Sequence, residues 1–210
     1  MVEVRGTGES VRFLNAGYIN SPQNRPCARE DSFTEDELET AALKVIGKEL
    51  AAFVKLGPGE TLQGWQVSRL IDSVTDDSGE LTEKVVASRI LFTRAIDSVP
   101  VLGPGNKVSV TFANDGTLVG FDLDWPKLAR KKGNPRITPF SFTRNEADRR
   151  LGLAWGQGGA TEKVFECGYY DPGVAGLSEG NSLQPACVSI AEYGPNEPNQ
   201  MIVIPCEEKD

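Results

Sequence analysis

The sequence predicts an α+β protein made of two related units, each a helix packed on an antiparallel β-sheet. Three observations support this fold class: a helical hydrophobic period over about 34–56, strand-like alternation over 60–125, and a repeated helix start that again precedes strand-like runs. The predicted organisation is an N-terminal extended arm (1–31), a first helix-plus-sheet unit (32–126), a basic linker (127–140) and a second, shorter helix-plus-sheet unit (141–210).

The first helix is predicted by its cap and by its period. Thr34 is a suitable N-cap, and Glu37 stands three residues later, which is the spacing of a capping box. Phe33 before the cap and Leu38 after it can close a hydrophobic staple. Apolar residues then recur at helical spacing before Gly57-Pro58 ends the helix, at Leu38, Ala41, Ala42, Val45, Ile46 and Phe53.

Residues 60–125 alternate apolar and polar side chains as strands do. An Asp76-Asp77-Ser78-Gly79 turn separates two long runs, and Gly103-Pro104-Gly105 marks a later turn. Asn114-Asp115-Gly116 is a hairpin signal between two further alternating runs. The sum is one helix against about four antiparallel strands.

The second half repeats this order of elements. After the basic, Pro- and Gly-interrupted segment 127–140, Ser141, Phe142, Thr143 and Glu146 match Ser32, Phe33, Thr34 and Glu37. Candidate strands follow at 164–170, 183–190 and 201–205. The shared order favours a duplication over a coincidence of two capping boxes.

Composition excludes several classes of partner. The 210 residues carry a net charge of −8, whereas nucleic acids and anionic membranes attract concentrated Lys and Arg. No stretch approaches the roughly 20 apolar residues of a membrane-spanning helix. We therefore expect no nucleic-acid partner and no membrane span.

The four cysteines, Cys27, Cys167, Cys187 and Cys206, bear on the compartment. None belongs to a C-x-x-C pair, and without histidine a zinc site would need four scattered thiolates, so two disulfides are favoured. Disulfides persist in oxidising compartments. The first ten residues show no basic region followed by an apolar run, so no signal peptide is predicted there. We expect a secreted or periplasmic protein whose export signal has been removed; a cytosolic protein with reduced thiols is the alternative.

The strand runs also predict a pairing. If 164–170 and 183–190 form a hairpin, Cys167 and Cys187 lie side by side on neighbouring strands, close enough to bond. The two remaining cysteines, Cys27 and Cys206, would then form the second disulfide and tie the N-terminal arm to the last strand. Two other pairings of the four cysteines remain open.

The run FTRAIDSVPVLGPGNKVSVTFANDGTLVGFDLDW (92–125) resembles the sheet of PepSY-like and FTP-like propeptide domains. The matching positions are Arg94, Val99, Pro100, Val101, Val108, Val110, Asp115, Gly116, Val119 and Gly120, with Ser98 in place of the usual glycine. The later GYYDPG…SLQPACVSI stretch resembles a second such unit more loosely, as a tandem repeat would. The resemblance implies an exported, non-enzymatic inhibitor, chaperone or scaffold module with a helix on an antiparallel sheet.

The sequence offers little catalytic chemistry. Without histidine, Ser-His-Asp and Cys-His arrangements are excluded, and no S-x-x-K motif is present. Asp122 and Asp124 could hold two carboxylates on one strand face, and Asp76-Asp77 could contribute to a calcium site. Strand-end and turn roles account for them better, so we expect no catalytic residue, no metal and no cofactor.

The binding candidates are mainly aromatic. They are Trp65, Arg94, Trp125, Tyr169 and Tyr170, which could line a surface for a peptide or a sugar, although Trp65 on an alternating strand fits a core position better. The sequence therefore predicts a non-catalytic exported binding or scaffold module that recognises another polypeptide, by strand addition or in a groove between helix and sheet. The alternative is a small-molecule binder or carboxylate-based enzyme with a pocket between sheet and helix.

Overall fold

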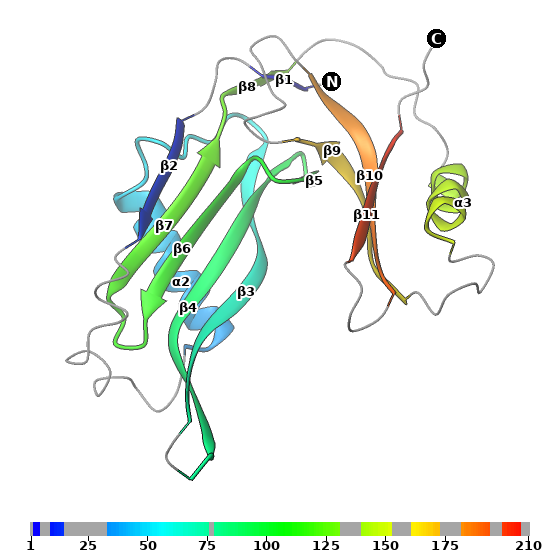
Figure 1. The fold of residues 1–210 in the computed structure, drawn as a ribbon. Helices are drawn as coiled ribbons and strands as arrows, with labels where there is room; N and C mark the ends of the chain where they lie inside the picture. The colour runs from blue at the N-terminus through cyan, green and yellow to red at the C-terminus, as the bar shows by residue number, and fades with distance from the viewer. Residues whose placement is uncertain are drawn as a thin grey trace. The chain divides into compact units, whose positions relative to one another are not determined.

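The computed structural model describes residues 2–4, 9–14, 33–75, 78–130, 140–152, 161–172, 182–193 and 199–206 (Figure 1). The chain forms two compact units, which we call the helix-backed unit and the disulfide unit. The helix-backed unit consists of Gly8–Arg94 and Asn106–Trp125, and the disulfide unit of Met1–Thr7, Ala95–Gly105 and Pro126–Asp210. Neither unit is one continuous segment of the sequence.

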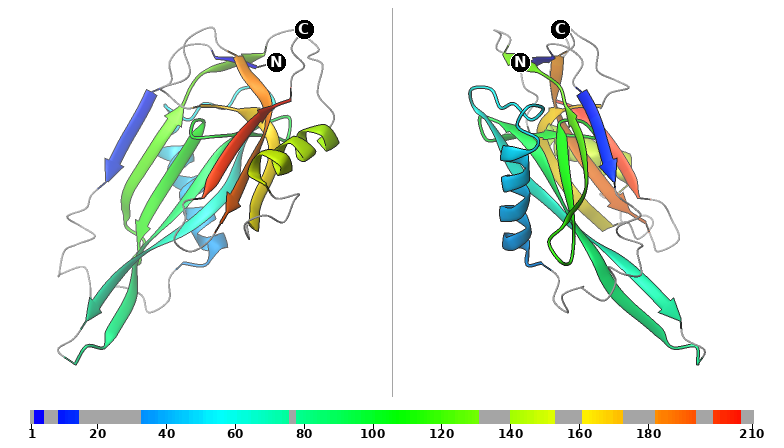
Figure 2. Two further views of the ribbon diagram at one scale, coloured as in Figure 1. Left: turned by 45° about the vertical axis from the view of Figure 1, so that its right-hand side comes forward. Right: turned by 90° about the vertical axis from the view of Figure 1, so that its left-hand side faces the viewer.

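The helix-backed unit is a sheet with one helix on it. Its elements are β2 (Glu9–Leu14), α2 (Glu35–Lys48), β3 (Glu60–Thr75), β4 (Leu81–Ile96, as far as Arg94), β6 (Lys107–Ala113) and β7 (Leu118–Trp125). The strand order is β2-β7-β6-β4-β3, and the pairs β2–β7, β7–β6 and β6–β4 are antiparallel. Helix α2 lies along one face of this sheet (Figure 2).

The predicted capping box of α2 is confirmed. The Thr34 hydroxyl accepts a hydrogen bond from the Glu37 amide at 3.3 Å, and the Glu37 carboxylate accepts one from the Thr34 amide at 3.0 Å. The helix ends at Lys48, earlier than the predicted 56. The chain then turns, with the amides of Phe53 and Val54 donating to the Leu50 carbonyl, and this turn keeps Leu50 in the core.

The core of the helix-backed unit lies between α2 and the sheet. The helix contributes Leu38, Ala42 and Ile46 at the predicted spacing. The strands contribute the alternate residues Ile90, Phe92, Val108, Val110, Phe112, Leu123 and Trp125. Side chains of alternate strand residues point to one face of the sheet. The apolar face of the strands therefore packs against the apolar face of α2 in this core.

The disulfide unit contains seven further elements and the end of β4. They are β1 (Val2–Val4), β5 (Val99–Leu102), β8 (Leu128–Arg130), α3 (Phe140–Leu151), β9 (Thr161–Tyr170), β10 (Ser182–Glu192) and β11 (Gln200–Pro205). Strand β10 is central, because it pairs with β9, β11 and β1, all antiparallel. Strands β1 and β2 fall within the predicted arm, and β8 within the predicted linker.

The predicted fold class, two related units each with a helix on its own antiparallel sheet, is wrong. The strands hydrogen-bond as one 11-stranded sheet in the order β2-β7-β6-β4-β5-β9-β10-β1-β8, with β3 on β4 and β11 on β10. The β5–β9 pair is parallel, so the sheet is mixed. The reason is the length of β4, which pairs with β6 in one unit and, through Ala95 and Ile96, with β5 in the other. Alternation predicts the face that a residue occupies but not its partner strand.

The two matching helix starts also differ in structure. Thr34 is the N-cap of α2, whereas Thr143 lies inside α3, which begins at Phe140, and its side chain is buried. Glu146, the counterpart of Glu37, instead bonds Arg149 and Arg150 in its own helix. Pro139 stands just before Phe140, and proline favours the first turn of a helix. An earlier helix start moves the matching residues out of the capping positions.

The Gly103-Pro104-Gly105 loop encloses Asp171 in the disulfide unit. Asp171 is fully buried, and its amide donates to the Leu102 carbonyl at 2.8 Å. A Cβ on Gly105 would lie 2.1 Å from the Asp171 carboxylate, and one on Gly103 would lie 2.1 Å from the Asp171 carbonyl oxygen. The loop therefore needs glycine at both positions because the Asp171 backbone packs against Gly103 and the Asp171 side chain packs against Gly105.

This packing yields a first prediction. We expect Gly105→Ala to lower the free energy of unfolding by about 1–3 kcal/mol, because the new methyl group overlaps the buried Asp171 carboxylate. Gly47→Ala is the matched control: it lies on the exposed side of α2 with no neighbour within 4 Å. There the same change should stabilise the protein by about 0.5–1 kcal/mol. Urea denaturation measures both, and equal shifts in the same direction would contradict the packing argument.

Candidate functional site

Strands β3 and β4 continue beyond the rest of their sheet as a two-stranded ribbon (Figures 1 and 2). Strand β6 pairs with β4 only from Ala87 to Thr93, so residues 81–86 of β4 have β3 as their partner strand. We call residues 68–75 of β3 together with 81–86 of β4 the outer ribbon. Six strand residues span about 20 Å, which is enough length to pair with a short peptide.

The outer ribbon exposes large apolar side chains. Leu70 is 37% exposed, Ile71 55% and Leu81 58%. Neighbouring residues of a strand point to opposite faces, so Leu70 and Ile71 make both faces of the ribbon apolar. Within the described residues, β3 pairs with β4 alone, and its other edge therefore presents backbone N–H and C=O groups. The sequence carried a signal for this, because the adjacent Leu70 and Ile71 interrupt the alternation of β3.

The base of the outer ribbon is fixed. The Asn114 side-chain amide, which is buried at the β6–β7 turn, donates to the Val85 carbonyl. The Arg69 guanidinium donates to the Phe33 carbonyl at 2.7 Å, next to the start of α2. The ribbon is thus anchored where it leaves the sheet, while its outer part stays exposed.

Two of the predicted binding residues, Arg94 and Trp125, lie together but inside the protein. The Arg94 guanidinium carbon lies 4.1 Å from the centre of the Trp125 ring, and its Nε lies 3.6 Å from the Glu60 carboxylate. Trp125 is 4% exposed, and its indole N–H donates to the Lys55 carbonyl at 3.2 Å. Glu60 also accepts from the Gly57 amide at 3.1 Å. These contacts fasten the 55–60 segment to β4 and β7 and leave no surface for a ligand.

The other aromatic candidates do not join them. Tyr169 and Tyr170 belong to the disulfide unit and are both half-buried. Tyr169 packs on Ile96, Val101 and Leu183, and the Tyr170 ring lies against Gly103. The side chain of Trp65 lies outside the described residues.

The carboxylates considered for catalysis have structural neighbours. Asp122 is in register with Ser109 and Asp124 with Lys107, and both lie on the face of β7 away from Leu123 and the α2 core. Asp76 and Asp77 lie outside the described residues. No group of three His, Cys, Asp or Glu residues in the described part of the chain is arranged to hold a metal ion.

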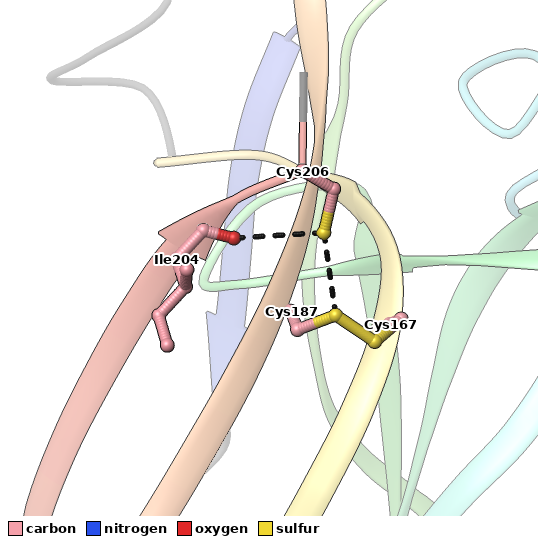
Figure 3. Close-up of a disulfide and its surroundings, with 4 residues drawn as sticks. All are labelled: Cys167, Cys187, Ile204 and Cys206. Carbon is pink, nitrogen blue, oxygen red and sulfur yellow. Dashed lines mark hydrogen bonds between the residues drawn. A yellow bond between two sulfur atoms is a disulfide. The ribbon is translucent and has the colours of Figure 1, made fainter. Parts of the chain in front are cut away.

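The predicted Cys167–Cys187 disulfide is confirmed (Figure 3). The two residues are directly in register on β9 and β10, as the hairpin argument required. Cys206 is a buried free cysteine whose Sγ lies 3.3 Å from that of Cys187. Burial raises the pKa of the Cys206 thiol, and a hydrogen bond with Thr143 lowers it in part. The predicted Cys27–Cys206 disulfide is not present, because Cys206 is free in this structure; Cys27 itself lies outside the described residues.

No protein-family model and no curated protein matches this sequence. Among solved structures, the chain is similar to an uncharacterized protein from Eubacterium rectale, with 13% sequence identity and a TM-score of 0.47. The alignment covers 86% of this chain and 56% of that protein, so the chain spans little more than half its length. The resemblance to PepSY-like and FTP-like domains stays a prediction. Neither described helix is long and apolar enough to cross a membrane.

A second prediction concerns the buried arginine. We expect Arg94→Met to lower the free energy of unfolding by about 3 kcal/mol, because it leaves the nearly buried Glu60 carboxylate without its cation. Arg149→Met is the control, since that guanidinium is 65% exposed beside Glu146 and should change stability little. Chemical denaturation compares the two. If both variants unfolded like the wild type, Arg94 would not hold the 55–60 segment.

Proposed function

We propose that this protein is a non-catalytic, exported binding module that recognises an extended segment of another polypeptide, which adds as a strand to the open edge of β3. The observation that carries the proposal is the outer ribbon, with its unpaired edge in the described structure and its exposed Leu70, Ile71 and Leu81. Strand addition supplies affinity through main-chain hydrogen bonds and specificity through alternate side chains.

The energetics of the outer ribbon favour a third strand. A two-stranded hairpin is marginally stable in water, and three strands with an apolar face are far more stable. The inner half of β3 has Leu62 and Val67 against the α2 core, whereas no described side chain of the outer half belongs to that core. An added strand would complete the edge hydrogen bonds and cover apolar area worth about 25 cal/mol per Å².

Edge strands that are not used for binding are usually protected. Proteins shield them with Lys, Pro, bulges or short length, since open edges promote aggregation. Strand β3 is 16 residues long and contains neither Lys nor Pro. Its outer half has two charged residues, Arg69 and Asp72, and the Arg69 guanidinium is engaged with the Phe33 carbonyl. An edge strand of this length without Lys or Pro supports a binding role.

The apolar side chains on both faces of the outer ribbon indicate which residues the bound peptide should contain. With Leu70 on one face and Ile71 on the other, a partner strand with β-branched or aromatic residues on both faces would pack best. The disulfide supports an oxidising compartment, so we place the encounter outside the cytoplasm.

The test selects peptides from a displayed library of random extended decapeptides against the intact protein. We expect the selected peptides to slow amide hydrogen exchange in 68–75 of β3. Ile71→Asp should weaken their binding by at least about tenfold, since the Ile71 side chain contributes on the order of 1.5 kcal/mol when buried. Peptides N-methylated at alternate residues should lose binding, because the ladder needs their N–H groups.

Phe142→Asp is the matched control. Phe142 is 61% exposed on α3, so this variant removes a similar apolar side chain away from the ribbon and should bind the peptides as the wild type does. Selected peptides that bind Ile71→Asp at full strength, or that protect residues other than β3, would exclude strand addition at this edge.

A further inference from the structure

Three sulfur atoms lie in a row on adjacent strands of the disulfide unit. Cys167 on β9 and Cys187 on β10 form the disulfide, and Cys206 directly follows β11 on the other side of β10. The Cys206 amide donates to the Pro185 carbonyl at 2.8 Å, which fixes its backbone beside β10. Its Sγ lies 3.3 Å from the Cys187 Sγ. A buried thiol is thus held in contact with a disulfide.

The direction of approach suits a reaction. Figure 3 shows the Cys206 sulfur reaching Cys187 from the side away from Cys167. A thiolate that attacks a disulfide sulfur displaces the sulfur on the far side. An S–S bond is about 2.05 Å long, so the two sulfur atoms need to approach by only about 1 Å.

We propose that Cys206 and the Cys167–Cys187 disulfide form an internal thiol–disulfide exchange site that releases Cys167 as a free thiol. The Cys206 thiol loses its proton, and its sulfur forms a bond to the Cys187 Sγ. The bond from Cys187 to Cys167 breaks, and Cys167 leaves as a thiolate that takes up a proton. Reactants and products each contain one S–S bond and one thiol, so the exchange consumes no oxidant or reductant.

The exchange changes which cysteine meets solvent. Cys187 and Cys206 are 1% and 6% exposed, whereas Cys167 is only half-buried. The free thiol therefore moves from a closed position to one that reagents or a partner's thiol can reach. Burial raises the pKa of Cys206, so its thiolate is scarce at neutral pH and the exchange is slow there. The Cys167–Cys187 form is the one present in this structure. A buried cysteine that only fills space in the core would expose no reactive thiol.

The experiment incubates the intact protein with iodoacetamide at mildly alkaline pH, stops the reaction with acid, digests with pepsin and maps the unreduced peptides by mass spectrometry. We expect the label on Cys167, with Cys187 joined to Cys206 in the same molecules. A label on Cys206 beside an intact Cys167–Cys187 bond would overturn the proposal. So would a Cys27–Cys206 bond, or an intact Cys167–Cys187 bond with both Cys167 and Cys206 unlabelled throughout.

Variants identify the attacking sulfur. Cys206→Ser should abolish labelling of Cys167, and Cys206→Ala serves the same purpose if the serine variant does not fold. Cys27→Ser is the matched control and should leave Cys167 labelling unchanged. Labelling of Cys167 that survives the loss of Cys206 would assign the attack to another thiol and overturn the proposal.

Discussion

The apolar contact between α2 and one face of the β7-β6-β4 strands is the interaction on which the helix-backed unit depends. It joins Leu38, Ala42 and Ile46 to the buried residues of the strands in one core. Among the described side chains of β3, the partly buried Leu62 and Val67 pack against that core, and β3 is held in the sheet by its pairing with β4. The outer ribbon extends from this base, where Asn114 and Arg69 fasten it. An exposed element on a rigid support is the usual arrangement of a binding site, because the support limits the entropy lost on binding.

Local features of the fold could be predicted, and the overall arrangement could not. The capping box at Thr34 and Glu37 was predictable because it involves residues three apart, and the Cys167–Cys187 pair because a hairpin relates its strands by symmetry. The continuous sheet depends on the parallel pairing of β5 with β9, which places Val101 beside Tyr169, and alternation gives no information about a partner so distant in sequence. The prediction of a second capping box was wrong for a local reason: α3 starts at Phe140, so Thr143 lies within the helix and not at its N-cap.

For the candidate site too, local features could be predicted from the sequence and the spatial arrangement could not. Arg94 and Trp125 were chosen for chemical character, and the structure shows them together but buried, because their spacing carries no information about what covers them. The outer ribbon was missed, although Leu70 and Ile71 interrupt the alternation of their strand. Two adjacent apolar residues of a strand point to opposite faces, so one of them cannot face the core. Whether neighbouring strands bury that residue depends on where β6 ends, which the sequence does not indicate. The Cys206–Cys187 contact likewise depends on the register of β11 on β10.

The register of β1 has a consequence for how the chain is made. Val2 is paired with Leu183 and Glu3 with Ser182, so residues from the two ends of the sequence share one ladder. A ribosome adds about 5–20 residues per second, so the first strand waits roughly 10–40 s for its β10 neighbour to emerge. During translation the helix-backed unit can close once Trp125 has left the exit tunnel, whereas the disulfide unit stays open until β10 and β11 have emerged. The helix-backed unit is therefore expected to fold first. The disulfide unit is expected to fold later and slowly, because its β1–β10 pairing joins residues far apart in the sequence.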